Sequence, residues 1–298
     1  RERERETYME RRREYECASA FAHYNLSLRS TTLATQGTRH RVFECGSSRP
    51  DFQLSADSSN LKLACGFGGD TADINITFSS IAREYLFNEG LPKEMVIKVG
   101  SPMMEIINFY DEKIKNSKIL ADLEITKKNY FLVSIHREEN INSKNFHKIS
   151  EILNTIASKY KIPIIVSTHP RTRKKIEESN FSYSSQIRFL KPQNFSNYLK
   201  LQLNAKTVLS DSGTINEESS ILNFPALNIR EAHERPEAME ETSVMMTGIN
   251  CDRIIQCLEI LSFKEKDKTR DITLVKDYNV KNFSEKILRI IMSYTDYT

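Results

Sequence analysis

From residue 130 onward, short apolar runs alternate with longer segments in which apolar residues recur every three or four positions. The first run covers 130–135, and the spacing of Phe146, Ile149, Ile152 and Ile156 after it predicts a helix over 144–160. Further apolar runs predict strands over 163–167, 187–190, 207–210, 225–229 and 244–246. Helical spacing predicts helices over 171–179, 195–203, 215–222, 252–261 and 282–292.

The predicted strands are continuous apolar runs and do not alternate apolar with polar residues. Strands that are buried on both faces have this composition, as in parallel sheets covered by helices on either side. The regular strand–helix alternation therefore predicts an α/β domain with a doubly wound parallel sheet. Ligands bind such sheets outside the carboxyl ends of the strands, so we expect the functional residues just after each strand.

Basic residues and a short Ser-Gly-Thr turn occupy those positions. They are His136 and Arg137 after the first strand, His169 and Arg171 after the second, 191–193 after the third, 210–214 after the fourth and 230–237 after the fifth. Cations collected at one edge of a sheet indicate a site for an anionic ligand. A histidine after a strand is, however, often a structural hydrogen-bonding group, and Arg235 before Pro236 also fits a salt bridge within a loop.

Ser212, Gly213 and Thr214 directly precede the helix predicted over 215–222. The N–H groups and the dipole at a helix N-terminus suit a diphosphate, and a glycine lets the ligand approach the backbone. Glu217 and Glu218 lie in the first turn, where a carboxylate can accept hydrogen bonds from ribose hydroxyls. The same sequence is also typical of an ordinary helix N-cap, and only the neighbouring basic loops favour the ligand.

The composition of the 298 residues is that of a globular protein, with 39% hydrophobic and 28% charged residues. A net charge of +3 is too small to indicate nucleic-acid binding, and no apolar run is long enough to span a bilayer. The five cysteines show no CxxC spacing, which favours reduced thiols in a cytoplasmic protein. No metal-ligand cluster and no GxGxxG motif is present, so we expect neither a metal nor a nicotinamide cofactor.

The first 69 residues differ in composition from the rest of the chain. They contain ten Arg, one Lys and no Ile, whereas residues 70–298 contain ten Arg, twenty-two Lys and thirty Ile. The leading Arg-Glu repeat and the Ser/Thr-rich stretches after it lack the pattern of a βα unit. We therefore expect residues 1–69 to be an atypical leader that is not a native Rossmann domain. A divergent domain is the alternative, and a basic arm for nucleic acid is disfavoured because the glutamates neutralise it.

Four long strings occur in order along the chain. They are SIHREEN at 134–140, STHPR at 167–171, LSDSGTINEES at 209–219 and AHERPEA at 232–238. Together they resemble the signature of the non-hydrolysing UDP-N-acetylglucosamine 2-epimerases, over about residues 70–265. The strings TADINIT at 71–77, GSPM at 100–103, IRFLKP at 187–192 and SSILNFPA at 219–226 resemble one branch of that family. That branch forms UDP-N-acetyl-L-fucosamine from its L-talo isomer for surface polysaccharides.

The resemblance implies a GT-B-like fold with two domains, in which the C-terminal Rossmann domain holds UDP. It implies a remnant of the N-terminal domain at 70–100, a UDP-binding domain at 101–275 and a C-terminal crossover helix within 276–298, with the N-terminal domain truncated or replaced. By matching motif, the residues expected to contact UDP are His136, Gln193, Tyr198, Ser212, Gly213, Thr214, Glu218 and Arg235. Tyr198 matches an aromatic residue near the base, and Thr214 replaces a glycine that is common in other branches.

The reaction that the resemblance implies is C2 epimerisation by elimination and re-addition of UDP, without a cofactor. It needs carboxylates near C2, which the family places in the N-terminal domain, so catalysis by this chain is in question. His136 is the catalytic candidate of the C-terminal half, and Glu44 in the string ECGSSR at 44–49 partly matches the family's Glu-Ala-Gly-x-Arg. The family also implies a cytoplasmic homodimer that binds neither nucleic acid nor membrane. A UDP-binding protein without turnover and a GT-B glycosyltransferase are the alternatives.

Overall fold

The computed structural model describes residues 42–45, 52–55, 62–65, 74–135, 143–168, 173, 175–176, 179, 181–230, 235–262 and 272–294. For 42–45, 52–55, 62–65 and 143–144 it describes the backbone alone. The chain divides into two compact units. One consists of Phe109–Val275, and the other consists of Arg1–Asn108 together with Lys276–Thr298. Each unit is described below by itself.

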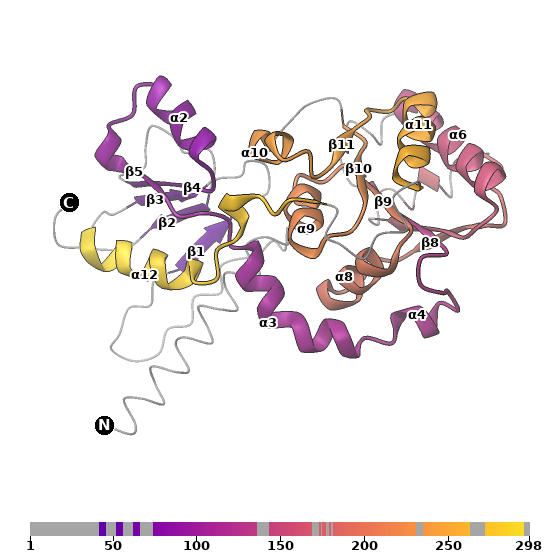
Figure 1. Cartoon of the computed structure of the whole chain (residues 1–298), viewed down its shortest axis with the longest axis horizontal. Coiled ribbons are helices and arrows are strands. Elements are labelled where there is room, and N and C mark those ends of the chain that lie inside the picture. Colours follow the sequence, from indigo (N-terminus) through magenta and orange to yellow (C-terminus); the bar gives the residue numbers. More distant parts are fainter. Residues whose placement is uncertain are drawn as a thin grey trace. The chain divides into compact units, whose positions relative to one another are not determined.

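The unit formed by 109–275 is built on a six-stranded sheet (Figure 1). Its strands are β6 (Phe131–Ile135), β7 (Ile164–Thr168), β8 (Ile187–Leu190), β9 (Thr207–Ser210), β10 (Ala226–Asn228) and β11 (Met245–Met246). The order across the sheet is β11-β10-β9-β6-β7-β8, and every neighbouring pair is parallel. All six strands lie within one residue of the predicted bounds at each end, so the predicted α/β class is confirmed.

Four connecting helices follow the predicted periodicity: α6 (Ser143–Tyr160), α8 (Phe195–Asn204), α9 (Ile215–Leu222) and α11 (Cys251–Ser262). Helices α3 (Met103–Asn116) and α4 (Ile119–Asp122), which precede the first predicted strand, were not predicted. The helix predicted over 171–179 lies mostly outside the described residues. A short helix that the periodicity did not predict, α10 (Pro236–Glu240), has a proline at its start, where a missing N–H costs no hydrogen bond.

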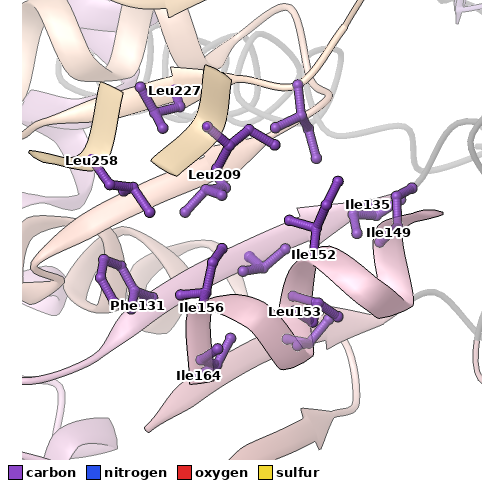
Figure 2. Packing of buried hydrophobic residues seen from close by; sticks show 14 of the residues in the cluster. Phe131, Ile135, Ile149, Ile152, Leu153, Ile156, Ile164, Leu209, Leu227 and Leu258 are labelled. Atoms are coloured by element: carbon purple, nitrogen blue, oxygen red, sulfur yellow. The ribbon is translucent and has the colours of Figure 1, made fainter. Parts of the chain in front are cut away.

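Apolar side chains fill both faces of this sheet. On one face, Phe131, Val133 and Ile135 of β6 pack in a cluster with residues of α6 and α11. Figure 2 shows this cluster, with Ile152 and Ile156 of α6 against the strands and Leu258 of α11 beside Leu209. On the other face, Leu132 belongs to a second cluster with residues of α4, α8 and α9. Because consecutive residues of β6 enter opposite cores, the strand is apolar throughout its length.

The second unit contains a sheet in the order β1-β2-β3-β4-β5. The strands are β1 (Val42–Cys45), β2 (Phe52–Ser55), β3 (Lys62–Cys65), β4 (Ile74–Thr77) and β5 (Val96–Lys98). The pairs β1–β2 and β2–β3 are antiparallel, whereas β3–β4 and β4–β5 are parallel. Helix α2 (Ser80–Asn88) connects β4 to β5.

The end of the chain packs on this second sheet. Helix α12 (Phe283–Tyr294) buries Phe283 against Phe78, with ring centroids 6.3 Å apart, in a cluster that includes Ile74 and Ile76 of β4. The amphipathic helix predicted over 282–292 is thereby confirmed as α12. Across the part of the chain that the structure describes, no helix has both the length and the apolar character that crossing a bilayer requires.

Candidate functional site

The order of the strands places a topological switch point between β6 and β9. The chain builds β6, β7 and β8 outward in one direction and then returns to place β9 on the other side of β6. Ser134 of β6 is the register partner of Ser210 of β9, and the N–H of Asp211 donates to the carbonyl oxygen of Ser134 at 3.2 Å. Ligands of doubly wound sheets bind in the crevice outside the strand ends at such a point. The turn after β9 opens at this position.

The turn between β9 and α9 is held by its own hydroxyl groups. The hydroxyl oxygens of Ser212 and Thr214 lie 2.9 Å apart, and the Thr214 N–H donates to the Ser212 Oγ at 3.3 Å. The Ser212 N–H in turn donates to the Ser210 Oγ at 3.1 Å. Thr214 is the N-cap residue of α9, but within the described part of the chain its side chain makes no capping hydrogen bond to the helix. The turn is therefore preformed by side chains, and capping by Thr214 does not close the end of the helix.

Two buried carboxylates follow in the first turn of α9. The Glu217 side chain is 0% exposed, and its Oε1 accepts a hydrogen bond from the Arg235 Nε at 2.9 Å. Arg235 is the N-cap residue of α10, and its side chain is 17% exposed. An unpaired carboxylate at this depth would be strongly destabilising, and the guanidinium compensates its charge. The alternative interpretation of Arg235, a salt bridge, is thus present in the structure.

The carboxyl group of Glu218 is stabilised by a hydrogen bond from an amide side chain. Its Oε2 accepts a hydrogen bond from the Nε2 of Gln202 on α8 at 2.6 Å, and both side chains are buried. Burial raises the pKa of Glu218 to about 7, although hydrogen bonds from Gln202 and Thr214 act to lower it, and the charge of Glu217 raises it further. Glu218 therefore exchanges its proton near neutral pH, which few carboxyl groups do.

Tyr198 lies one helical turn before Gln202 on α8 and is partly buried against the core on that face of the sheet. Burial and the charge of Glu218 raise the pKa of Tyr198, while hydrogen bonds with Ser134 and Gln202 lower it. Its phenol hydroxyl therefore stays protonated and connects β6 to α8. Together, Tyr198, Gln202 and Glu218 form a buried polar network beneath the switch point.

The remaining predicted site residues are less closely defined. Gln193 lies in the loop between β8 and α8, and its side-chain amide donates to the carbonyl oxygen of Lys191 at 2.9 Å. His136, directly after β6, lies outside the described residues. Glu44 lies in β1, of which the structure describes the backbone alone. Among the described residues, no group of three or more His, Cys, Asp and Glu side chains is arranged to hold a metal ion.

Gln202 was not found from the sequence. It belongs to no motif, and its position on α8 between Leu201 and Leu203 gives no sign of a polar role. Its only signal is the spacing of four residues from Tyr198, which places both side chains on one face of a helix. Its partner Glu218 is 16 residues away, so the contact depends on how α8 packs against α9.

The arrangement can bind a ligand that carries an anionic group and, next to it, hydroxyl groups. The turn at 212–214 places the hydroxyls of Ser212 and Thr214 at the start of a helix, and Arg235 provides a cation already joined to that helix through Glu217. Glu218, one residue further along, provides a carboxylate that can accept hydrogen bonds from hydroxyl groups.

Residues 68–292 match the family described as UDP-N-acetylglucosamine 2-epimerase. A UDP-N-acetylglucosamine 2-epimerase of Methanocaldococcus jannaschii is 31% identical over 197 residues, which are 63% of this chain and 54% of that protein. The chain thus spans about half the length of this relative.

Solved structures that are similar to this chain include those of two UDP-N-acetylglucosamine 2-epimerases. The structure of UDP-N-acetylglucosamine 2-epimerase from Rickettsia bellii is 45% identical, with a TM-score of 0.70 over 76% of this chain and 61% of that one. A structure of the Methanocaldococcus jannaschii UDP-GlcNAc 2-epimerase, in complex with UDP-GlcNAc and UDP, is 27% identical. Its TM-score is 0.66 over 75% of this chain and 62% of that chain. These likenesses confirm the expected GT-B-like α/β fold class.

Proposed function

The chain belongs to the UDP-N-acetylglucosamine 2-epimerase family, and from that premise we propose that its 109–275 unit binds the UDP part of a UDP-N-acetylhexosamine. The observation that carries the proposal is the turn at 212–214, which lies at the switch point of the sheet and opens α9. In support, a solved relative with the same fold was crystallised with UDP-GlcNAc and UDP.

In this proposal, the diphosphate lies against the backbone of Gly213 and the hydroxyls of Ser212 and Thr214, with Arg235 as its cation. Two carboxylates in the first turn of α9 would by themselves repel a diphosphate. The ion pair with Arg235 offsets the charge of Glu217, and the pKa of Glu218 near 7 reduces its mean charge at neutral pH. The acidic helix start is therefore compatible with an anionic ligand.

Glu218 would accept hydrogen bonds from the ribose hydroxyls, and Tyr198 would lie near the base. Gln193 and His136 complete the proposed UDP contacts, with His136 also serving the chemistry at the sugar. The hydroxyl of Tyr198 is engaged in hydrogen bonds with Ser134 and Gln202, so the aromatic ring is the part of this side chain that can contact a base. Each of these assignments follows the family motif onto the matching residue of this chain.

The proposed reaction inverts C2 of the sugar. The proton at C2 is removed while the bond between C1 and the diphosphate oxygen breaks, and the electron pair of that bond leaves with UDP. The resulting 2-acetamidoglycal then regains UDP at C1 and a proton on the opposite face of C2. A cationic, hydrogen-bonding site for the leaving diphosphate lowers the barrier to such a step.

For the substrate we propose the 6-deoxy L-talo sugar nucleotide, with UDP-N-acetyl-L-fucosamine as product and surface polysaccharide as its destination. The strings at 71–77, 100–103, 187–192 and 219–226 support this branch. UDP-N-acetylglucosamine, after which the 45% identical relative is titled, is the competing substrate. We further propose a cytoplasmic homodimer without cofactor.

Hydrogen exchange at C2 tests the proposed reaction directly. Incubation of the full chain with each sugar nucleotide in deuterated water should introduce solvent deuterium at C2, because every passage through the glycal replaces that proton. NMR or mass spectrometry of the recovered sugar measures it. UDP binding without deuterium at C2 of either sugar would instead indicate a UDP-binding protein without turnover. If exchange occurs, Glu44→Gln and His136→Asn separate the two catalytic candidates.

A further inference from the structure

Gln202 is a buried polar residue that the proposed UDP site does not use directly. Its side chain is 1% exposed, and its neighbours Leu199 and Leu201 on α8 are fully buried. Burying a primary amide costs free energy unless it is hydrogen-bonded, and an apolar residue of the same length would fill the same space. Within the described part of the chain, the Gln202 Oε1 has no hydrogen-bond partner. The position thus carries an energetic cost that packing does not explain.

The contact that offsets this cost is the hydrogen bond to Glu218. The Gln202 Nε2 donates to the Glu218 Oε2 at 2.6 Å, a short distance that is typical when the acceptor is charged. Thr214 also hydrogen-bonds to this carboxylate, from the start of α9. A carboxylate held from two directions has a fixed plane. The hydrogen bond from Gln202 occupies one lone pair of the Glu218 Oε2 and so sets the direction in which the other lone pairs of the carboxylate point.

The charges around Glu218 also decide whether it can act as an acceptor. The titratable groups near Glu218 are Glu217 on the same helix and Tyr198 on α8. Arg235 is paired to Glu217, and the charge of Asp211, before the turn, acts on Tyr198. Burial and Glu217 favour the protonated carboxyl, whereas the Gln202 amide favours the carboxylate. A carboxylate accepts hydrogen bonds from hydroxyl groups at both oxygens, and protonation removes part of that capacity.

We propose that Gln202 is a positioning residue that gives the nucleotide site its preference for a ribonucleotide over a deoxyribonucleotide, by holding Glu218 as an oriented acceptor for the ribose hydroxyls. This inference rests on the proposed binding of UDP. It assigns Gln202 a role that neither the diphosphate contacts nor the base contacts share. Loss of its amide should therefore act mainly on the contacts of Glu218 with the sugar hydroxyls, because Tyr198, which also hydrogen-bonds to Gln202, keeps its hydrogen bond with Ser134.

The test compares the affinities for UDP, 2′-deoxy-UDP and 3′-deoxy-UDP by calorimetry, using the full chain. Wild type should prefer UDP over at least one deoxy analogue by about tenfold, the value of one charged hydrogen bond. Gln202→Met keeps the length of the side chain and removes the amide. Near neutral pH it should lower the affinity for UDP to that for the deoxy analogue, and it should change the affinity for the analogue by no more than about twofold. Asn204→Met, at the end of the same helix, should leave the preference intact; the Asn204 side chain bonds within α8 to the carbonyl oxygen of Lys200.

A pH profile separates this role from packing. The preference for UDP should increase as Glu218 ionises, and the diphosphate's own titration cancels because all three ligands share it. In Gln202→Met the preference that is lost near neutral pH should return only at higher pH, with its midpoint shifted upward, because the hydrogen bond that lowers the pKa of Glu218 is lost. Gln202→Asn keeps an amide that is too short to reach Glu218, and it should behave like Gln202→Met.

The possible failures are distinguishable. If wild type does not bind UDP, the proposed function itself is wrong. If wild type binds UDP but does not prefer it over either analogue, the ribose preference is wrong while UDP binding stands. If Gln202→Met and Gln202→Asn lower the affinities for all three ligands equally, or if the pH midpoint of the preference for UDP does not move, Gln202 acts through packing and the inference is overturned.

Discussion

At the scale of single residues, Glu217 and Glu218 are adjacent in the sequence and yet are stabilised in different ways. Glu217 is compensated by a cation 18 residues away, and Glu218 by an amide 16 residues away. The sequence predicts both carboxylates in the first turn of α9, because helix position is a local property. It does not predict their partners, because those depend on how α8 and α10 pack against α9. Arg235 illustrates the consequence: its salt bridge is present, and its contact with a diphosphate stays a prediction.

The pKa of Glu218 predicts a pH dependence of stability. Its pKa is raised in the folded chain from 4.5 to about 7, so the folded state binds a proton that the unfolded state has lost between these pH values. The contribution of Glu218 to the free energy of unfolding is therefore greatest below pH 4.5 and falls by about 3 kcal/mol as the pH rises to 7.

Urea unfolding of wild type and Glu218→Gln at several pH values measures this contribution. The variant cannot ionise, so its stability relative to wild type should increase with pH over that window and then level off. All other titrating groups are common to both proteins and cancel. A stability difference that does not vary with pH would mean that Glu218 ionises normally in the folded chain.

At the scale of elements, the sequence predicts the six strands of the 109–275 sheet to within one residue. Each strand is a short apolar run that polar or proline-containing segments delimit, so its bounds are encoded locally. Helix α10 was missed because Pro236 within a loop-like sequence favours a turn, and five residues give no periodicity. In the second unit, the contacts between the segment that begins at Lys276 and residues near Gly100 were also beyond prediction, since they depend on a close approach at Gly100.

Gly100 has φ +96°, and a β-carbon there would lie 2.3 Å from Val280 Cγ2 and 2.9 Å from the carbonyl oxygen of Asp277. The nearby segment is also held by an ion pair of 2.7 Å between the Lys98 Nζ and the Asp277 Oδ1. Gly100→Ala should therefore destabilise the unit through both backbone strain and the clash, by about 2–5 kcal/mol.

Gly90→Ala is the matched control. Gly90 has nearly the same φ, +94°, but a β-carbon there meets no atom within 4 Å. Gly90→Ala should lower the free energy of unfolding only by the cost of the backbone strain, about 1–2 kcal/mol. The difference between the two variants in chemical unfolding measures how firmly the 276–280 segment is seated on Gly100. Equal losses would show that this segment does not pack there.

At the scale of the whole molecule, the sequence-derived resemblance predicted the family, and the match over 68–292 confirms it. Within the 109–275 unit, the predicted turn and the adjacent Glu218 lie at the switch point because the topology brings the ends of β6 and β9 side by side. What the motifs could not supply is the balance of charge at that point. In the proposed diphosphate site, Arg235 offsets the charge of Glu217, and burial keeps Glu218 partly protonated at neutral pH.

The central claim is that this edge of the sheet binds UDP, and calorimetric titration of the full chain with UDP tests it most directly. We predict one UDP per chain with a Kd below about 1 mM. Replacing both members of the ion pair, as Arg235→Met with Glu217→Gln, avoids leaving a buried charge alone. This double variant should lower the affinity for UDP about 10–150-fold without changing the affinity for uridine. The absence of saturable UDP binding, or equal weakening of uridine and UDP, would contradict the account.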